Sequence, residues 1–265
     1  MASINISIII ILIILLMIMS KTALNYRKRI YGGYHKSKYL EKSKLNKIEL
    51  SDLSPLFVTN EYGPTTDSEV KFIGRGNIYV PGGTTDTETW ILSVLAKNAK
   101  IMFEFGTCTG KTAYLWALNS SDDAKVYTLT LPPTEAEQMN KQSESDSDLA
   151  SKNAVNESNF DKFIYTGTEA ERKIVQIFCD SKDYSEKELT GKVDLIFIDG
   201  SHAYSYIKSD TQKALKMLSP KGIILWHDYH LSADSIDVWR YLNELSNLKP
   251  VYSIPGTTLA VYKSE

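Results

Sequence analysis

The pattern of hydrophobic positions alternates between two periods through most of the chain. Short apolar runs rich in Ile, Val, Phe and Tyr are separated by stretches in which apolar residues recur every three or four positions. The runs predict β-strands and the stretches predict helices, because side chains repeat about every 2 residues in a strand and about every 3.6 in a helix. Strands are expected at residues 100–105, 125–129, 174–178, 193–198 and 222–226. Helices are expected at residues 86–98, 111–119, 203–217 and 232–246.

A regular alternation of strands and helices is typical of βαβ units, which place helices on both faces of a parallel sheet. After residue 249 the pattern changes to two apolar runs, 250–254 and 258–262, which Pro255-Gly256 joins. A Pro-Gly pair favours a tight turn, so these runs predict an antiparallel pair. The sequence therefore predicts an α/β fold: a doubly wound, Rossmann-like sheet of seven strands that a C-terminal antiparallel pair closes.

The first twenty residues differ from the rest of the chain. Residues 1–20 carry no charge, and the apolar run from Ile8 to Met19 is unbroken. This run is short for a membrane span, yet it has no Lys or Arg before it and no convincing small-residue cleavage site after it. We therefore expect an uncleaved membrane segment over residues 1–20 rather than a signal peptide. Whether it spans the bilayer or lies on its surface stays open.

Charge is divided unevenly along the chain. Of its 30 basic and 32 acidic residues, nine basic and one acidic lie in residues 21–47, which leaves 21 and 31, a net charge of −10, for residues 48–265. The stretch 21–47 predicts a basic juxtamembrane linker, and the positive-inside bias then places the globular part in the cytoplasm, with a single N-terminal anchor in the membrane. The acidic globular part argues against a nucleic-acid partner. Residues 134–159 are polar and Ser-rich, which predicts a mobile loop.

The stretch EFGTCTGKT, residues 104–112, allows two interpretations. A phosphate-binding P-loop needs four residues between its glycines, whereas three separate Gly106 from Gly110. Glu104 ends a strand and would repel a triphosphate but attract a cationic ligand. The loop therefore favours a cationic ligand over a triphosphate. A P-loop nucleotide hydrolase stays open as an alternative, because the apolar strand LIFID ends in Asp199, as a magnesium-binding strand would.

Five motifs occur in order at workable spacings: IMFEFGTCTGKTAYLWAL, VYTLTLPP, KIVQIFCDSKDY, VDLIFIDGSHAYSYIKSD and SPKGIILWHDY. As a set, over about Gly82–Tyr262, they resemble the class I S-adenosylmethionine-dependent methyltransferases, and more narrowly the small-molecule and sugar O-methyltransferase-like group with DG-x-H-x-Y and HDY signatures. The resemblance implies that residues 48–265 form a methyltransferase domain with S-adenosylmethionine as cofactor and a small-molecule or carbohydrate hydroxyl as acceptor. A non-catalytic, membrane-tethered scaffold descended from the same fold stays open as an alternative, and the oligomeric state is not indicated.

The resemblance also implies which residues hold the cofactor. The implied cofactor-binding residues are Glu104, Gly106, Thr107, Gly110, Asp180, Ser181 and Asp199. The first four would pack the methionine part, and Asp180 would accept a hydrogen bond from the adenine amine. Thr130 stands where the family usually has an acidic residue that grips the ribose, and a hydroxyl would give a weaker grip unless Glu135 assists.

Two residues are the implied catalytic pair. Asp199 would orient the sulfonium end, the acceptor or a metal, and His202 would take the proton of the acceptor hydroxyl as the methyl group arrives. Metal-dependent relatives hold magnesium at the positions of Asp199, His227 and Asp228. Mg²⁺ prefers oxygen ligands, so His227 weakens the case for magnesium, which stays an open alternative. Because methyl transfer needs mainly alignment, we expect positioning to supply most of the rate.

Overall fold

The computed structural model describes residues 19–21, 45–74, 83–132, 146, 157–158 and 160–264. Almost all of the predicted membrane segment and basic linker, and most of the predicted loop 134–159, lie outside these ranges. In the described ranges, no helix has both the length and the apolar character that a membrane span requires. The described residues between 45 and 230 and between 234 and 264 belong to one compact unit.

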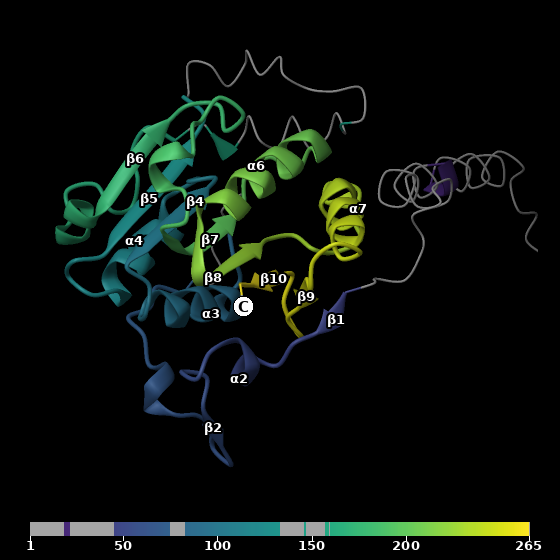
Figure 1. The fold of residues 1–265 in the computed structure, drawn as a ribbon. Helices are drawn as coiled ribbons and strands as arrows, with labels where there is room; N and C mark the ends of the chain where they lie inside the picture. Colours follow the sequence, from purple (N-terminus) through teal and green to yellow (C-terminus); the bar gives the residue numbers. More distant parts are fainter. Residues whose placement is uncertain are drawn as a thin grey trace, which may run out of the picture. The chain divides into compact units, whose positions relative to one another are not determined.

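Strands and helices alternate through this unit (Figure 1). Its strands are β1 (Asn46–Lys47), β2 (Thr59–Asn60), β3 (Gly63–Pro64), β4 (Ile101–Phe105), β5 (Lys125–Thr130), β6 (Ile174–Phe178), β7 (Val193–Ile198), β8 (Leu218–Trp226), β9 (Tyr252–Ser253) and β10 (Ala260–Lys263). Its α-helices are α2 (Leu50–Leu53), α3 (Asp86–Ala96), α4 (Lys111–Asn119), α6 (Tyr204–Met217) and α7 (Ile236–Leu245). Short 3₁₀ helices cover Thr66–Ser68, Glu169–Lys173 and Lys187–Leu189.

The main sheet has the strand order β1-β9-β10-β8-β7-β4-β5-β6 within the described residues (Figure 1). The central strands β4 to β8 pair in parallel, and β10 pairs antiparallel with both β8 and β9. The predicted doubly wound sheet with a C-terminal antiparallel pair is therefore confirmed. The chain winds outward in opposite directions from β4 and β7, so the ligand crevice of such a fold is expected at the carboxyl ends of these two strands.

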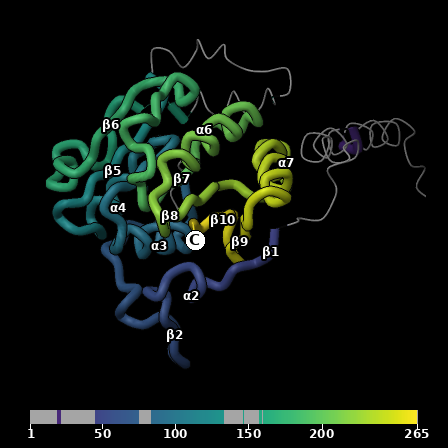
Figure 2. Tube along the Cα trace, viewed as in Figure 1, coloured from purple at the N-terminus to yellow at the C-terminus, as the bar shows by residue number. Residues whose placement is uncertain are grey.

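Several boundaries differ from the predicted ones; β8, for example, begins at Leu218 rather than at residue 222. The sheet gains an eighth strand, β1, which pairs in parallel with β9 although about two hundred residues separate them (Figure 2). Residues 46–47 were expected in the basic linker, because so short a strand has no apolar pattern of its own and only its partner defines it. Helix α7 begins at Ile236 rather than at residue 232, and β9 has two residues rather than five.

Helices cover both faces of the sheet (Figure 1). Met102 of β4 and Phe197 of β7 pack into the main core with residues of α3 and α4. On the opposite face, Trp226 at the end of β8 donates a hydrogen bond to the hydroxyl of Thr211 in α6, at 2.9 Å. Because side chains alternate along a strand, Glu104 lies on the same face as Met102, beneath the start of α4. The core thus places this carboxyl at the floor of the crevice.

Candidate active site

The loop after β4 passes very close to the loop after β7. Gly106 has a φ of +99°, and a Cβ on it would lie 2.1 Å from the carbonyl oxygen of Asp199. The backbone N–H of Gly106 donates to the carbonyl of Leu129 at 2.8 Å, and the N–H of Asp199 donates to the carbonyl of Phe105 at 2.8 Å. Only glycine allows both this conformation and this approach. Gly106 therefore sets the spacing of the two loops that bound the crevice.

The same loop ends in a second left-handed glycine. Gly110 has a φ of +78° and is the residue at which α4 begins, and a Cβ on it would lie 2.6 Å from the Tyr165 ring. Cys108 between them also has a positive φ, of +46°, which is uncommon for a residue with a side chain. Burial raises the pKa of the Cys108 thiol to about 12, so it is a filler of the loop and not a nucleophile.

Glu104 begins a chain of buried polar contacts beneath this loop. The Thr128 hydroxyl donates to Glu104 Oε2 at 2.6 Å, and the hydroxyls of Thr128 and Thr107 lie 2.8 Å apart. Burial raises the pKa of Glu104 to about 8, since the charge of Asp199 adds to burial and the hydrogen bond from Thr128 offsets only part of it. A buried carboxyl of this kind is ionised most readily beside a cation.

Two cavities meet at this loop and share Gly106, Cys108 and Asp199 in their walls. The first has a volume of about 270 Å³ and lies over Glu104 and the start of α4, with Lys111 in its wall. The second runs across the carboxyl ends of β5, β6 and β7. Its further lining includes Thr130, Cys179, Ser181, Gly200, Tyr206 and Asp210. Together the cavities suit an elongated ligand with two chemically different halves.

The predicted cofactor residues do not all reach these cavities. Those that line one or both are Glu104, Gly106, Thr107, Ser181 and Asp199. Gly110 instead supports the start of α4. Asp180 is not in the lining: its Oδ1 accepts from the backbone N–H of Lys182 at 2.8 Å, and its Oδ2 accepts from the hydroxyl of Tyr206 at 2.8 Å. In this structure Asp180 therefore caps its own turn. Glu135 lies outside the described residues.

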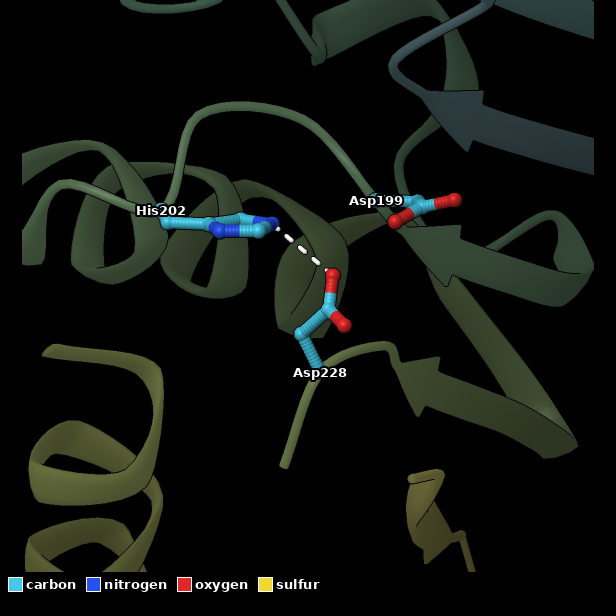
Figure 3. Close-up of side chains that lie close together, drawn as sticks. All are labelled: Asp199, His202 and Asp228. Atoms are coloured by element: carbon cyan, nitrogen blue, oxygen red, sulfur yellow. Dashed lines mark ion pairs between the residues drawn. The ribbon is translucent and has the colours of Figure 1, made fainter. Parts of the chain in front are cut away.

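The residues after β7 and β8 form a cluster of charges. Figure 3 shows Asp199 at the end of β7, His202 in the loop before α6 and Asp228 just after β8, with the ion pair between His202 and Asp228 dashed. His202 Nε2 lies 3.0 Å from Asp228 Oδ2. His227 Nδ1 lies 2.9 Å from Asp199 Oδ1 and 3.0 Å from Asp228 Oδ2. The two motifs thus place two imidazoles between carboxylates.

These contacts decide the protonation of the histidines. Burial lowers the pKa of His202, but the hydrogen bond and charge of Asp228 outweigh it and raise that pKa to about 9. Burial likewise opposes the charged form of His227, yet Asp199 and Asp228 raise the pKa of His227 well above its usual range. Both imidazoles are therefore cations near neutral pH. His202 Nδ1 also lies 3.2 Å from the carbonyl oxygen of Asp234, so both of its ring nitrogens are engaged.

Comparison with known proteins identifies the kind of domain that contains this crevice. Residues 103–229, just under half of the chain, match the family model described as "Methyltransferase domain". The chain contains a methyltransferase domain. The match spans the loop after β4 and both charged motifs, and it confirms the methyltransferase predicted from the sequence.

Single proteins resemble this domain only distantly. The uncharacterized protein y4gI of Sinorhizobium fredii is 35% identical over 63 residues, which is 24% of this chain and 7% of that protein, so the two share only a short stretch. The O-methyltransferase TomG of Streptomyces achromogenes, solved with S-adenosylmethionine, is 17% identical over 69% of this chain and 82% of its own, with a TM-score of 0.46. The S-adenosylhomocysteine-bound methyltransferase PaMTH1 of Podospora anserina is 16% identical over 69% and 80%, with a TM-score of 0.48.

Glu88, which precedes the matched residues 103–229, contacts the site but could not be recognised from the sequence. It lies in the first turn of α3, and its side chain is 1% exposed. Its Oε2 accepts from the backbone N–H of Thr85 at 2.9 Å and lies 3.3 Å from His227 Nε2, and its Oε1 accepts from the N–H of Thr258 at 2.7 Å. The spacing Thr-x-x-Glu signals the helix cap. No local signal connects Glu88 to His227, which is 139 residues away.

The charged cluster of the methyltransferase domain can be tested as a metal site. One ligand atom from each of Asp199, His202 and Asp228 lies within 4.8 Å of the others, so distance alone would allow an ion. However, the carboxylates already face two protonated imidazoles, and Mg²⁺ prefers a shell of oxygens. The residues at the predicted positions Asp199, His227 and Asp228 therefore do not fit magnesium, and we assign no step to a metal.

Proposed function

We propose that this methyltransferase domain binds S-adenosylmethionine in the crevice and transfers its methyl group to a hydroxyl of a small-molecule or carbohydrate-like acceptor. The observation that carries the proposal is the pair of cavities that meet at Gly106 and have two carboxyls in their walls, the buried Glu104 and the nearly buried Asp199. S-adenosylmethionine has the matching form, because a positively charged sulfur joins its adenosine half to its methionine half.

The charges of the larger cavity favour the methionine half. Glu104 and Asp199 would face the ammonium and the sulfonium, whose charges stabilise ionised carboxylates. The ligand carboxylate would face Lys111 and the amino terminus of α4, where the helix dipole favours an anion. The adenosine half would then lie in the second cavity, against Thr130 at the end of β5. A triphosphate would place its negative charges against Glu104, which disfavours a nucleotide hydrolase.

The reaction needs one bond to form as another breaks. The acceptor oxygen attacks the methyl carbon, a C–O bond forms, the C–S bond breaks, and the sulfonium becomes a neutral thioether while the hydroxyl loses its proton. His202 was the predicted base, but its ion pair with Asp228 holds it protonated. Glu157 lies in the wall of the second cavity, and burial together with the charge of Asp199 raises its pKa to about 7, which suits a proton acceptor. We propose that His202 positions Asp228 and that Glu157 takes the proton.

Calorimetry on the full-length chain tests the cofactor assignment. We expect S-adenosylhomocysteine to bind and ATP to give no heat. Binding of ATP alone would instead support the nucleotide hydrolase. Release of S-adenosylhomocysteine from S-adenosylmethionine, followed over a panel of sugars and catechols, then tests transfer and identifies the acceptor class.

Two observations favour a second candidate, a cofactor-binding relative without catalysis. Thr130 offers the ribose a hydroxyl rather than a carboxylate, and His202 is not a free base. In that case S-adenosylhomocysteine would bind and no acceptor would be methylated. Methylation of any acceptor by the wild-type chain would exclude this second candidate. The Glu157→Gln variant then tests the base, because it should lower the rate of methyl transfer at least tenfold without weakening cofactor binding if Glu157 takes the proton.

We also propose, from the sequence alone, that residues 1–20 anchor the protein in a membrane with the methyltransferase domain in the cytoplasm. The supporting pattern is the uncharged apolar run followed by the basic stretch 21–47. Resistance of the protein to extraction from membranes with alkaline carbonate, together with protease access from the cytoplasmic side only, is the expected result. Full release into the soluble fraction would contradict it.

A further inference from the structure

Asp210 is a buried carboxyl that the proposed reaction does not use. It lies in α6, the residue is 1% exposed, and its Oδ1 has no hydrogen-bond partner among the residues that the structure describes. Within the described part of the chain it also forms no ion pair. Leaving a buried polar atom without a partner is destabilising, so such an atom in a folded protein calls for an explanation.

Asp210 lies in the wall of the second cavity, between two of its loops. The hydroxyl of Ser181, which follows β6, hydrogen-bonds to the Asp210 carboxyl. On the other side is Gly200, which follows β7: a Cβ built on it would lie 3.9 Å from Asp210 Oδ2. The carboxyl therefore lies on the side of the cavity bounded by the loops after β6 and β7, whereas Thr130 marks the side nearest β5.

Two charged residues near Asp210, Lys213 and Asp180, already make hydrogen bonds to other residues of the cavity wall. Lys213, one turn further along α6, donates to the backbone carbonyls of Lys182 and Tyr184, both at 2.8 Å, and to that of Ser181. Asp180, the acid that the sequence assigned to adenine, has both oxygens occupied by Lys182 and Tyr206. Unlike Asp180, Asp210 keeps an acceptor atom that has no hydrogen-bond partner among the described residues.

We propose that Asp210 determines the base specificity of the site, with its Oδ1 accepting a hydrogen bond from the exocyclic amine of adenine. This inference rests on the proposed function. The ribose hydroxyls are the other donors of the nucleoside, but they are expected nearer Thr130, at the end of β5. An amine donor would give the unpartnered oxygen the hydrogen bond that it lacks, and an oxygen acceptor in the same place would be repelled.

The test compares S-adenosylhomocysteine with S-inosylhomocysteine, in which a carbonyl oxygen replaces the amine, by calorimetry on the full-length chain. At about pH 8.5, above the pKa of about 7 to which burial raises the Asp210 carboxyl, we expect the wild-type chain to bind the adenosine compound at least tenfold more tightly. Hydrogen bonds to charged groups have a large effect, and the inosine oxygen would then face a carboxylate. In Asp210→Asn the preference should fall to about threefold or less, since the amide can also donate to the inosine oxygen. Asp180→Asn is the matched control and should keep the wild-type preference.

The outcomes separate this inference from the function on which it rests. If the wild-type chain binds neither compound, the proposed function itself fails. If it binds S-adenosylhomocysteine but Asp210→Asn keeps the preference, weakens both compounds equally, or is matched by Asp180→Asn, the assignment of Asp210 is wrong. Should Asp210→Asn fail to fold, the ratio is measured in Asp210→Ser, which leaves room for water and should likewise lose the preference.

Discussion

Two parts of the same crevice are held in place by different physical means. The loop after β4 depends on its backbone, because Gly106 and Gly110 adopt conformations and approaches that a side chain would prevent. The residues after β7 and β8 depend on charge, because two imidazolium groups lie among three buried or nearly buried carboxylates. Those carboxylates are Glu88, Asp199 and Asp228. The comparison shows that a short motif can specify backbone geometry by itself, whereas protonation depends on neighbours that the motif does not contain.

The largest effect should come from removing the central cation of the charged part. His227→Leu would leave Glu88, Asp199 and Asp228 without their shared partner, and breaking a buried ion pair from one side typically costs about 3 to 5 kcal/mol. The free energy of unfolding in urea measures the loss. His230→Leu is the control: His230 is 41% exposed and its Nδ1 lies 3.8 Å from Asp228, so we expect a change below about 1 kcal/mol. Equal losses in the two variants would show that the cluster is not a network centred on His227.

The next effect should come from the backbone part. Gly106→Ala would force a Cβ to within 2.1 Å of the Asp199 carbonyl at a φ of +99°, so we expect a loss of about 2 to 3 kcal/mol and weaker binding of S-adenosylhomocysteine. Gly191→Ala is the matched control, because Gly191 has a φ of +69° but nothing within 4 Å of the added carbon, and it should lose only about 1 kcal/mol. If both variants lose the same free energy of unfolding, Gly106 is needed for its backbone conformation and not for the close approach of the two loops.

Sequence patterns predicted most of the fold because hydrophobic alternation is local. The strands at 101–105, 125–130, 174–178 and 193–198 and the helices at 111–119 and 204–217 lie within one residue of their predicted ends. Strand β1 was missed because two residues carry no period, and only their pairing with β9 makes them a strand.

The site was predicted less completely, for a related reason. Residue types and loop positions are local, so Glu104, Gly106 and Asp199 were placed at the crevice before any contact was known. Whether a side chain is already engaged is not local. Asp180 is occupied by Lys182 and Tyr206, and Asp210 in the next helix keeps an oxygen without a partner, which no spacing in the sequence could indicate.

A third effect distinguishes the charged part by its response to pH. The pKa of His202 is raised from 6.5 to about 9 in the folded protein, so the stability contributed by its pair with Asp228 is fully present below pH 6.5 and is lost as the pH rises through 9. Relative to His202→Asn, the wild-type chain should lose on the order of 3 kcal/mol between pH 6.5 and 9.5, measured by urea unfolding at each pH. A constant difference between the two chains over this range would mean that His202 is not held as a cation.

The smallest effect should follow the removal of metal ions. A divalent ion that binds between Asp199, His202 and Asp228 would have to displace the proton of His202. Because the pKa of His202 is about 9, this costs on the order of 3 kcal/mol at neutral pH. The ion would also be repelled by the positive charge of His227, whose Nδ1 lies 2.9 Å from Asp199 Oδ1. We therefore expect treatment with EDTA, and subsequent addition of Mg²⁺, to change the melting temperature by less than about 1 °C and the binding of S-adenosylhomocysteine by less than about twofold. His227→Asp provides the internal comparison, because it replaces the imidazolium with a third carboxylate and should make the same position bind Mg²⁺ and melt at a higher temperature when the ion is present. A rise of the wild-type melting temperature with Mg²⁺ as large as that of the variant would show that the imidazolium does not exclude the ion, and that the charged part of the crevice resembles a metal site more closely than its protonation implies.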